Sequence, residues 1–383
     1  MSLNNNQQAF FELLRAGLWN KEARLSKFGA INLKEICRIA EEQSVVGLVA
    51  AGLEHVTDVK LPKEEVLMVV GQTLQLEQRN KAMNAFVSEL ISRLKDAGIN
   101  ALLVKGQGIA QCYEKPLWRA CGDVDLLLNA DDYEKAKKLL MPLATDVETE
   151  YTHFKHVGMT IPNTFGRSDK GRADGWVVEL HGTLHSRLSK RVDKQIDAVQ
   201  EDTFKFGNVR AWDNGGVTVF LPAVDNDVVF VFTHILHHFF FEGIGLRQIC
   251  DWCRLLWTYR NVIDVTGLAL RLDEMGIMSE WKAFAAYAVE YLGISAEAMP
   301  LYSDDAKWSR KAARINAFVL EVGNFGHKQR RDYNGMSYLR RKFVSFWGRL
   351  SDMLRHFRIF PLDSIRFFGG VLRSGLHAAV RGE

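Results

Sequence analysis

The chain has 383 residues, of which 47% are hydrophobic and 25% charged, a composition that excludes a disordered or fibrous protein. Its 49 Lys and Arg nearly balance 46 Asp and Glu, which excludes a histone-like or strongly acidic protein but not a local basic surface. No apolar stretch is long enough to predict a transmembrane helix, and no secretory signal is visible at the first residues. The five cysteines, an odd number, indicate reduced thiols, so we expect a cytoplasmic protein.

Residues 1–98 predict a helical region. Apolar side chains recur at three- and four-residue spacing near Phe10 and Ile36, and a longer pattern of the same kind covers 62–94. The segment 95–98 should end this helix, with Gly98 just beyond its C-terminus.

Residues 99–220 predict an α+β core, a small mixed sheet with flanking helices. Apolar runs at 99–104 and 124–128 suit buried strands, and 152–161 and 176–181 predict two more. Asn129 and the acidic residues after it signal the start of a helix that continues over 133–143. The segment 204–212 predicts a hairpin turning at Gly207-Asn208.

Residues 221–383 predict a second helical region, with Pro222 in the first turn of a helix. The pair Cys250 and Cys253, with histidines at 234, 237 and 238, fits a zinc site. The helical period of 246–259 instead favours two cysteines in the hydrophobic core, and we prefer that interpretation.

Two strands carry the most informative side chains. Asp123 and Asp125 share one face of a strand, because strand side chains alternate between faces. Glu179 and His181 likewise share a face of the strand over 176–181. If the two strands are neighbours, Glu179 becomes a third carboxylate, and three carboxylates can hold two divalent ions for phosphoryl or nucleotidyl transfer. Exposed acidic pairs are common, so this spacing alone is a weak signal.

A glycine-bearing turn precedes these strands. Lys105-Gly106-Gln107-Gly108 follows an apolar run and leads into a helix, an arrangement in which backbone amides and a lysine can approach phosphate oxygens. The turn matches neither a P-loop nor a dinucleotide fingerprint. Arg119 lies four residues before Asp123 and is a second candidate for phosphate binding, although a lone basic residue is usually a solvated surface charge.

Together these segments resemble an uncharacterised nucleotidyltransferase family, bacterial in origin, within the DNA polymerase β-like superfamily. The resemblance rests on Leu103-Val104-Lys105-Gly106, Tyr113, Arg119, Asp123-Val124-Asp125 and Val178-Glu179-Leu180-His181. It implies a polymerase β-like nucleotidyltransferase core over 99–220, between the two helical regions. The broader superfamily has Gly-Ser at the turn and often Asp as the third carboxylate, where this chain has Gly106-Gln107 and Glu179.

The resemblance also implies roles. Asp123, Asp125 and Glu179 would be the catalytic metal ligands for Mg²⁺ or Mn²⁺, and Lys105, Gly106, Gln107, Arg119 and His181 would bind the nucleotide. The expected reaction moves an NMP from an NTP to an acceptor hydroxyl and releases pyrophosphate. The alternatives are a toxin-like enzyme that modifies RNA or protein, and a catalytically silent nucleotide-binding or scaffold module. The acceptor stays open.

The last 56 residues are strongly basic. Residues 328–383 hold twelve Lys and Arg against four Asp and Glu, and aromatic residues are interleaved among them. This pattern fits a nucleic-acid surface, a basic helix at a membrane, or a helical bundle with an aromatic core and a solvated basic face. The third is the simplest interpretation, and nucleic acid is kept as a candidate partner.

Overall fold

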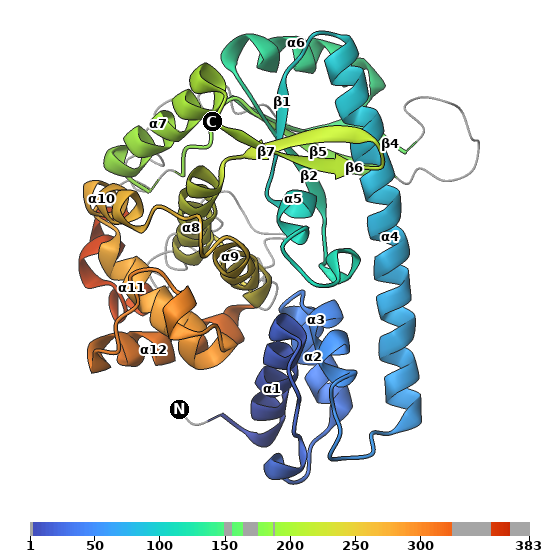
Figure 1. The fold of residues 1–383 in the computed structure, drawn as a ribbon, viewed down its shortest axis with the longest axis vertical. Coiled ribbons are helices and arrows are strands. Elements are labelled where there is room, and N and C mark those ends of the chain that lie inside the picture. Colours follow the sequence, from blue (N-terminus) through green and yellow to red (C-terminus); the bar gives the residue numbers. More distant parts are fainter. Residues whose placement is uncertain (1–2, 149–154, 164–174, 187, 324–353, 368–383) are drawn as a thin grey trace, which may run out of the picture.

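The computed structural model describes residues 3–148, 155–163, 175–186, 188–323 and 354–367 (Figure 1). Four helices come first: α1 (Asn5–Trp19), α2 (Leu33–Glu42), α3 (Val46–Leu53) and α4 (Lys63–Asp96). Helix α4 runs from the N-terminal helices to the sheet along one side of the molecule (Figure 1). It ends as the sequence predicts, since Gly98 follows in the left-handed region with φ +69°.

A seven-stranded mixed sheet follows, in the order β3-β4-β5-β2-β1-β7-β6. Its strands are β1 (Ala101–Val104), β2 (Asp123–Leu128), β3 (Asp146–Val147), β4 (His156–Pro162), β5 (Gly175–His181), β6 (Val209–Asn214) and β7 (Val217–Pro222). The short helix α5 (Gly106–Ala110) separates β1 from β2, α6 (Ala130–Leu140) follows β2, and α7 (Lys190–Phe206) follows β5. The predicted small mixed sheet with flanking helices is confirmed.

Two local predictions are wrong. Residues 204–206 belong to α7, and Gly207 is the left-handed C-cap of that helix, so no hairpin turns there. The hairpin is formed by β6 and β7 and turns at Gly215-Gly216. Pro222 ends β7, paired with Val209, and the next helix begins only at Val224.

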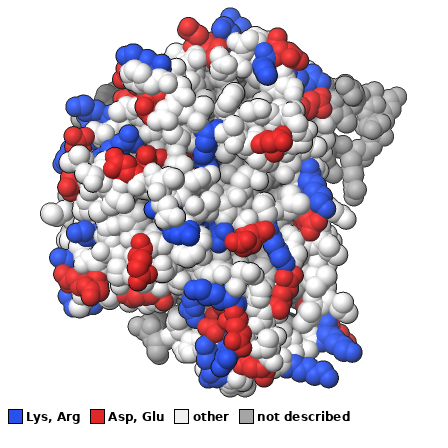
Figure 2. Space-filling view, viewed as in Figure 1, with Lys and Arg blue, Asp and Glu red and all other residues white. Residues whose placement is uncertain are grey.

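The main helices in the described part of the C-terminal region are α8 (Val224–Phe241), α9 (Leu246–Thr258), α10 (Val265–Met275), α11 (Met278–Tyr287) and α12 (Ala306–Val322), and residues 354–357 and 361–367 are also helical. Their buried side chains form one hydrophobic core with those of α1 and α2. One face of the sheet packs on this core, and the opposite face packs on α4 and α6 to form a second hydrophobic core. None of the described helices is long and apolar enough to cross a membrane. Basic and acidic side chains are interspersed over the face in Figure 2.

Candidate active site

The three predicted carboxylates lie at the centre of the sheet. Strand β2 pairs with β5 in parallel, with Asp125 opposite Glu179, and with β1 in antiparallel fashion, with Asp125 opposite Val104. The ligand oxygens of Asp123, Asp125 and Glu179 lie within 4.8 Å of one another. The expected adjacency of the two strands is therefore present, and it brings all three side chains to one point.

The carboxylates repel one another strongly. The neighbouring Asp125 charge, burial and the Glu179 charge raise the pKa of Asp123 to about 6, and the Lys105 charge opposes them only in part. Asp125 itself is 2% exposed. Oxygen ligands held this close form a site that a hard divalent cation fits, because its charge would relieve their repulsion.

Lys105 projects from the turn between β1 and α5 onto this cluster. Its Nζ lies 2.8 Å from Asp125 Oδ1. Burial disfavours the ammonium, but the charges of Asp125, Glu179 and Asp123 outweigh it and raise the lysine pKa. The Lys105 backbone has φ 59° and ψ −147°, a conformation that costs a non-glycine residue free energy, and such strain concentrates at functional sites. Gly106 follows at φ +42°.

Two histidines flank Glu179. His181 Nε2 lies 3.0 Å from Asp125 Oδ1 and 3.4 Å from Glu179 Oε2, and His156 Nε2 lies 3.3 Å from that same glutamate oxygen. Burial raises the pKa of Glu179, but hydrogen bonding to both imidazoles outweighs it and lowers that pKa overall. Burial lowers the pKa of His181, but hydrogen bonding to Asp125 and Glu179 outweighs it and raises that pKa overall. His181 was predicted from the sequence as a site residue, whereas His156 was not.

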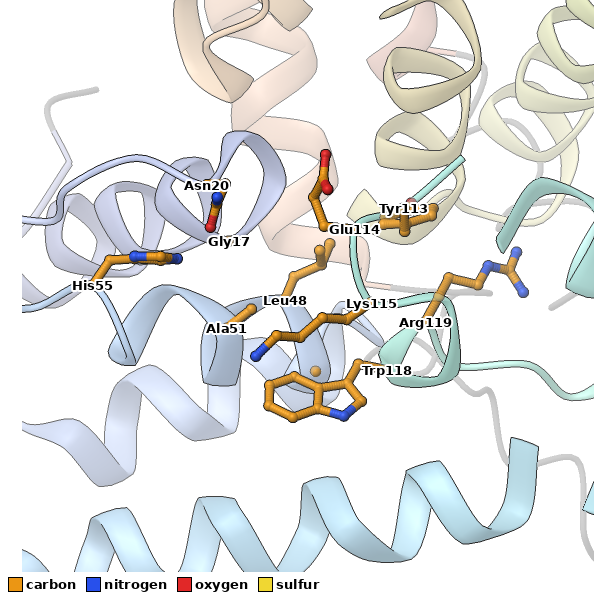
Figure 3. Close-up of a pocket in the computed structure, with 11 residues that line it drawn as sticks. Gly17, Asn20, Leu48, Ala51, His55, Tyr113, Glu114, Lys115, Trp118 and Arg119 are labelled. Atoms are coloured by element: carbon orange, nitrogen blue, oxygen red, sulfur yellow. The ribbon is translucent and has the colours of Figure 1, made fainter. Parts of the chain in front are cut away.

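Arg119 does not reach this cluster in the structure. It is buried and donates to Asp251 of α9 from Nε at 3.1 Å and from a terminal nitrogen at 2.5 Å. Tyr113, a residue of the family resemblance, donates to the same aspartate at 2.7 Å. In Figure 3 the Arg119 guanidinium points away from Lys115 and Trp118. Arg119 thus anchors the segment leading into β2 to a helix 132 residues further along the chain.

A different arginine lies nearer the carboxylates. Arg247 of α9 donates to the Ala120 carbonyl at 3.2 Å, and its charge lowers the pKa of Asp123. Burial, followed by the neighbouring Arg119 charge, lowers the pKa of Arg247 itself. Arg247 could not be predicted from the sequence, because its proximity to Asp123 depends on how α9 packs against the sheet.

Gln107 lies beside the site but faces away from it. Its side chain is 2% exposed and donates to Asn80 Oδ1 of α4 at 3.3 Å. Asn80, fully buried, also donates to the carbonyls of Leu117 at 2.8 Å and Arg119 at 2.7 Å. These bonds tie both ends of the 107–119 segment to the long helix.

The cysteines and histidines that the sequence offered as zinc ligands do not form a common site in the structure. Cys250 and Cys253 are fully buried in the hydrophobic core, and burial raises the pKa of each thiol. His234 and His238 contact each other at 2.9 Å, and burial, then the Lys105 charge, lowers the pKa of His234. Among the described residues, neither group of ligand atoms that could surround a metal ion includes these four side chains.

The basic C-terminal segment is described only over 354–367. There His356, Phe360 and Phe367 are buried against Phe239 and Phe240 of α8. Arg355 pairs with Glu321 of α12 at 3.1 Å. Arg340 and Arg341, two of the basic residues of 328–383, lie outside the described residues, so nucleic acid stays an untested candidate partner.

Carboxylates on adjacent strands, with a lysine from a glycine turn, form the arrangement that the resemblance to nucleotidyltransferases implies. The chain belongs to the family described as uncharacterised nucleotidyltransferase, whose model matches residues 29–293. No curated protein shows significant similarity to the sequence. The crystal structure of an antigenic nucleotidyltransferase-like protein from Paracoccidioides brasiliensis is 16% identical over 51% of this chain and 90% of that chain, with a TM-score of 0.31, too remote to carry an argument.

Proposed function

We propose that this chain is a metal-dependent nucleotidyltransferase that moves an NMP from an NTP to an acceptor hydroxyl and releases pyrophosphate. The observation that carries the proposal is the convergence of Asp123, Asp125 and Glu179 within 4.8 Å, next to Lys105. Family membership supports the reaction class.

The three carboxylates would hold Mg²⁺ or Mn²⁺, which neutralises phosphate charge and activates an attacking oxygen when bound. Glu179 stays ionised because two histidines lower its pKa, so it remains a ligand or proton acceptor at neutral pH. In the overall reaction the acceptor oxygen bonds to the α-phosphorus and the bond to the β-phosphate oxygen breaks. The hydroxyl proton passes to a carboxylate of the site.

Lys105 would bind the triphosphate. It now shares Asp125 Oδ1 with His181, at 2.8 and 3.0 Å. With Asp125 serving as a metal ligand, Lys105 would give up this ion pair and its ammonium would contact the phosphates. Gly106 begins α5, and the backbone amides of that turn would add to the phosphate contact. Arg119 would act at a distance, by fixing the strand that carries Asp123.

The test is labelling by each α-³²P-NTP, with Mg²⁺ or Mn²⁺, in the presence of a cell extract. The wild-type protein should transfer label to a discrete acceptor, and Asp123→Asn should abolish that transfer. Asp304→Asn, at an exposed position ahead of α12, is the matched control and should behave as wild type. Absence of labelling with all four nucleotides, or equal labelling by Asp123→Asn, would overturn the proposal.

A further inference from the structure

A second set of ligand atoms lies where β4 meets β5. The antiparallel register places His156 directly opposite His181, and Gly158 opposite Glu179. Residues facing each other across a strand pair, and residues two apart on one strand, share a face. His156, Glu179 and His181 therefore point to the same side of the sheet, from two strands whose geometry is fixed by seven paired positions.

The spacing of these three side chains matches that of ligands around one small ion. Each imidazole Nε2 lies 3.3 or 3.4 Å from the same oxygen, Glu179 Oε2, and all three ligand atoms lie within 4.8 Å of one another. Zinc binds nitrogen and oxygen at about 2.0–2.2 Å, which puts tetrahedral ligands about 3.3–3.6 Å apart. The two rings, 4.8 Å apart and inclined by 41°, are close enough for both nitrogens to face one point.

The three side chains are held by paired strands and are partly exposed to solvent. The side chains of His156, Glu179 and His181 are 23%, 26% and 13% exposed, so solvent reaches them while the sheet holds their backbones. Gly158 leaves the position facing Glu179 without a side chain, and the Glu148 carboxylate fills it, since a Cβ there would lie 2.8 Å from Glu148 Oε2. A further negative charge therefore lies beside the cluster.

We infer that His156, Glu179 and His181 bind a divalent transition-metal ion of the Zn²⁺ type. Two imidazoles and one carboxylate suit Zn²⁺ or Co²⁺, whereas Mg²⁺ prefers oxygen ligands. Three protein ligands leave a coordination position for water or substrate. The site shares Glu179 with the carboxylate cluster but uses neither Asp123 nor Asp125. It stands whether or not the chain transfers nucleotides.

The experiment is a Co²⁺ titration of the metal-stripped full-length protein, followed by visible absorption and competed with Zn²⁺. The wild-type protein should bind Co²⁺ with the spectrum of mixed nitrogen and oxygen ligands, which the carboxylates of Asp123, Asp125 and Glu179 alone would not give. His156→Ala should weaken binding at least tenfold, and His156→Asp, which restores a ligand atom, should recover part of it. His185→Ala is the matched control: His185 is a similarly exposed histidine paired with Asp197, and its loss should change nothing.

Absence of Co²⁺ binding, wild-type binding by His156→Ala, or an equal loss in His185→Ala would each overturn the inference. A thiolate charge-transfer band would do the same, by placing the ion on cysteine. Melting of the metal-stripped variants shows whether His156→Ala has kept its fold, and His156→Asp remains decisive if it has not. Failure of nucleotide labelling with an intact Co²⁺ spectrum would affect only the proposed function, and the reverse result only this inference.

Discussion

Replacing Asp123 with Asn should stabilise the metal-free protein at neutral pH. Asp123 has a pKa of about 6 in the fold against an ordinary value of 3.8, mainly because Asp125 is charged and burial disfavours its own charge. The folded chain therefore holds its proton more tightly than the unfolded chain. The contribution of protonated Asp123 to the stability of the fold is therefore lost as pH rises from about 4 to about 6, and it stays lost above that range. Asparagine is neutral throughout this pH range, so the variant does not suffer this loss of stability.

The magnitude follows from the shift. Two pKa units correspond to about 3 kcal/mol, an upper bound because Asn also alters the contacts with Lys105. An unfolding entropy of about 2.1 cal/mol/K per residue gives about 0.8 kcal/mol/K for this chain, so melting should rise by up to about 4 °C. The gain should be present at pH 7.5 and nearly absent at pH 4.

Calorimetry of EDTA-treated protein at the two pH values measures this difference, with Asp304→Asn as the charge-matched control. Adding Mn²⁺ at pH 7.5 should raise the melting temperature of the wild type more than that of Asp123→Asn, since the cation then relieves the same repulsion. A fall in melting temperature for Asp123→Asn at pH 7.5, or the same gain at both pH values, would refute the electrostatic reasoning. It would mean that Asp123 serves the fold through a hydrogen bond instead.

The features of the site that depend on one strand alone were predictable from the sequence, and those that depend on pairing between strands were not. Alternation along β2 and β5 is enough to place Asp123 beside Asp125 and Glu179 beside His181, because a strand has a period of two residues. The register between strands is not local. His156 lies in a predicted strand, yet only its pairing opposite His181 brings it to Glu179.

Long-range pairing also explains Arg119. Its position ahead of Asp123 suggested a phosphate contact, but the segment folds against α9, where Asp251 accepts from both Arg119 and Tyr113. Nothing in the sequence near residue 119 indicates a partner at 251. A buried arginine without such a carboxylate would be strongly destabilising. The packing of α9, which carries Asp251, therefore determines the position of the Arg119 guanidinium.

The misplaced hairpin has a different cause. Gly207-Asn208 and Gly215-Gly216 are both suitable turn sequences, and the choice between them depends on what precedes each. The buried residues of α7, Val192, Ile196 and Val199, recur at three and four residues and extend a helical pattern up to Gly207. That periodicity was the signal that could have assigned Gly207 to a helix end.

Three further substitutions test how the site is built. Lys105→Met should lower affinity for a non-hydrolysable NTP at least tenfold in equilibrium dialysis, since it removes the proposed phosphate contact. Asp251→Ala should lower the free energy of unfolding by about 3–5 kcal/mol in denaturant titration, because it leaves the buried Arg119 charge unpaired. Asn80→Leu keeps the branching of the side chain but removes both donors to the 107–119 segment. Each carbonyl left unpaired should cost about 1–3 kcal/mol. Gln78→Leu, the same kind of change at an exposed position of α4, should cost little. Nucleotide affinity should fall with Asn80→Leu as well, since the segment that it ties down begins next to Lys105 and ends before Asp123; unchanged stability and affinity would show that this segment is held by other contacts.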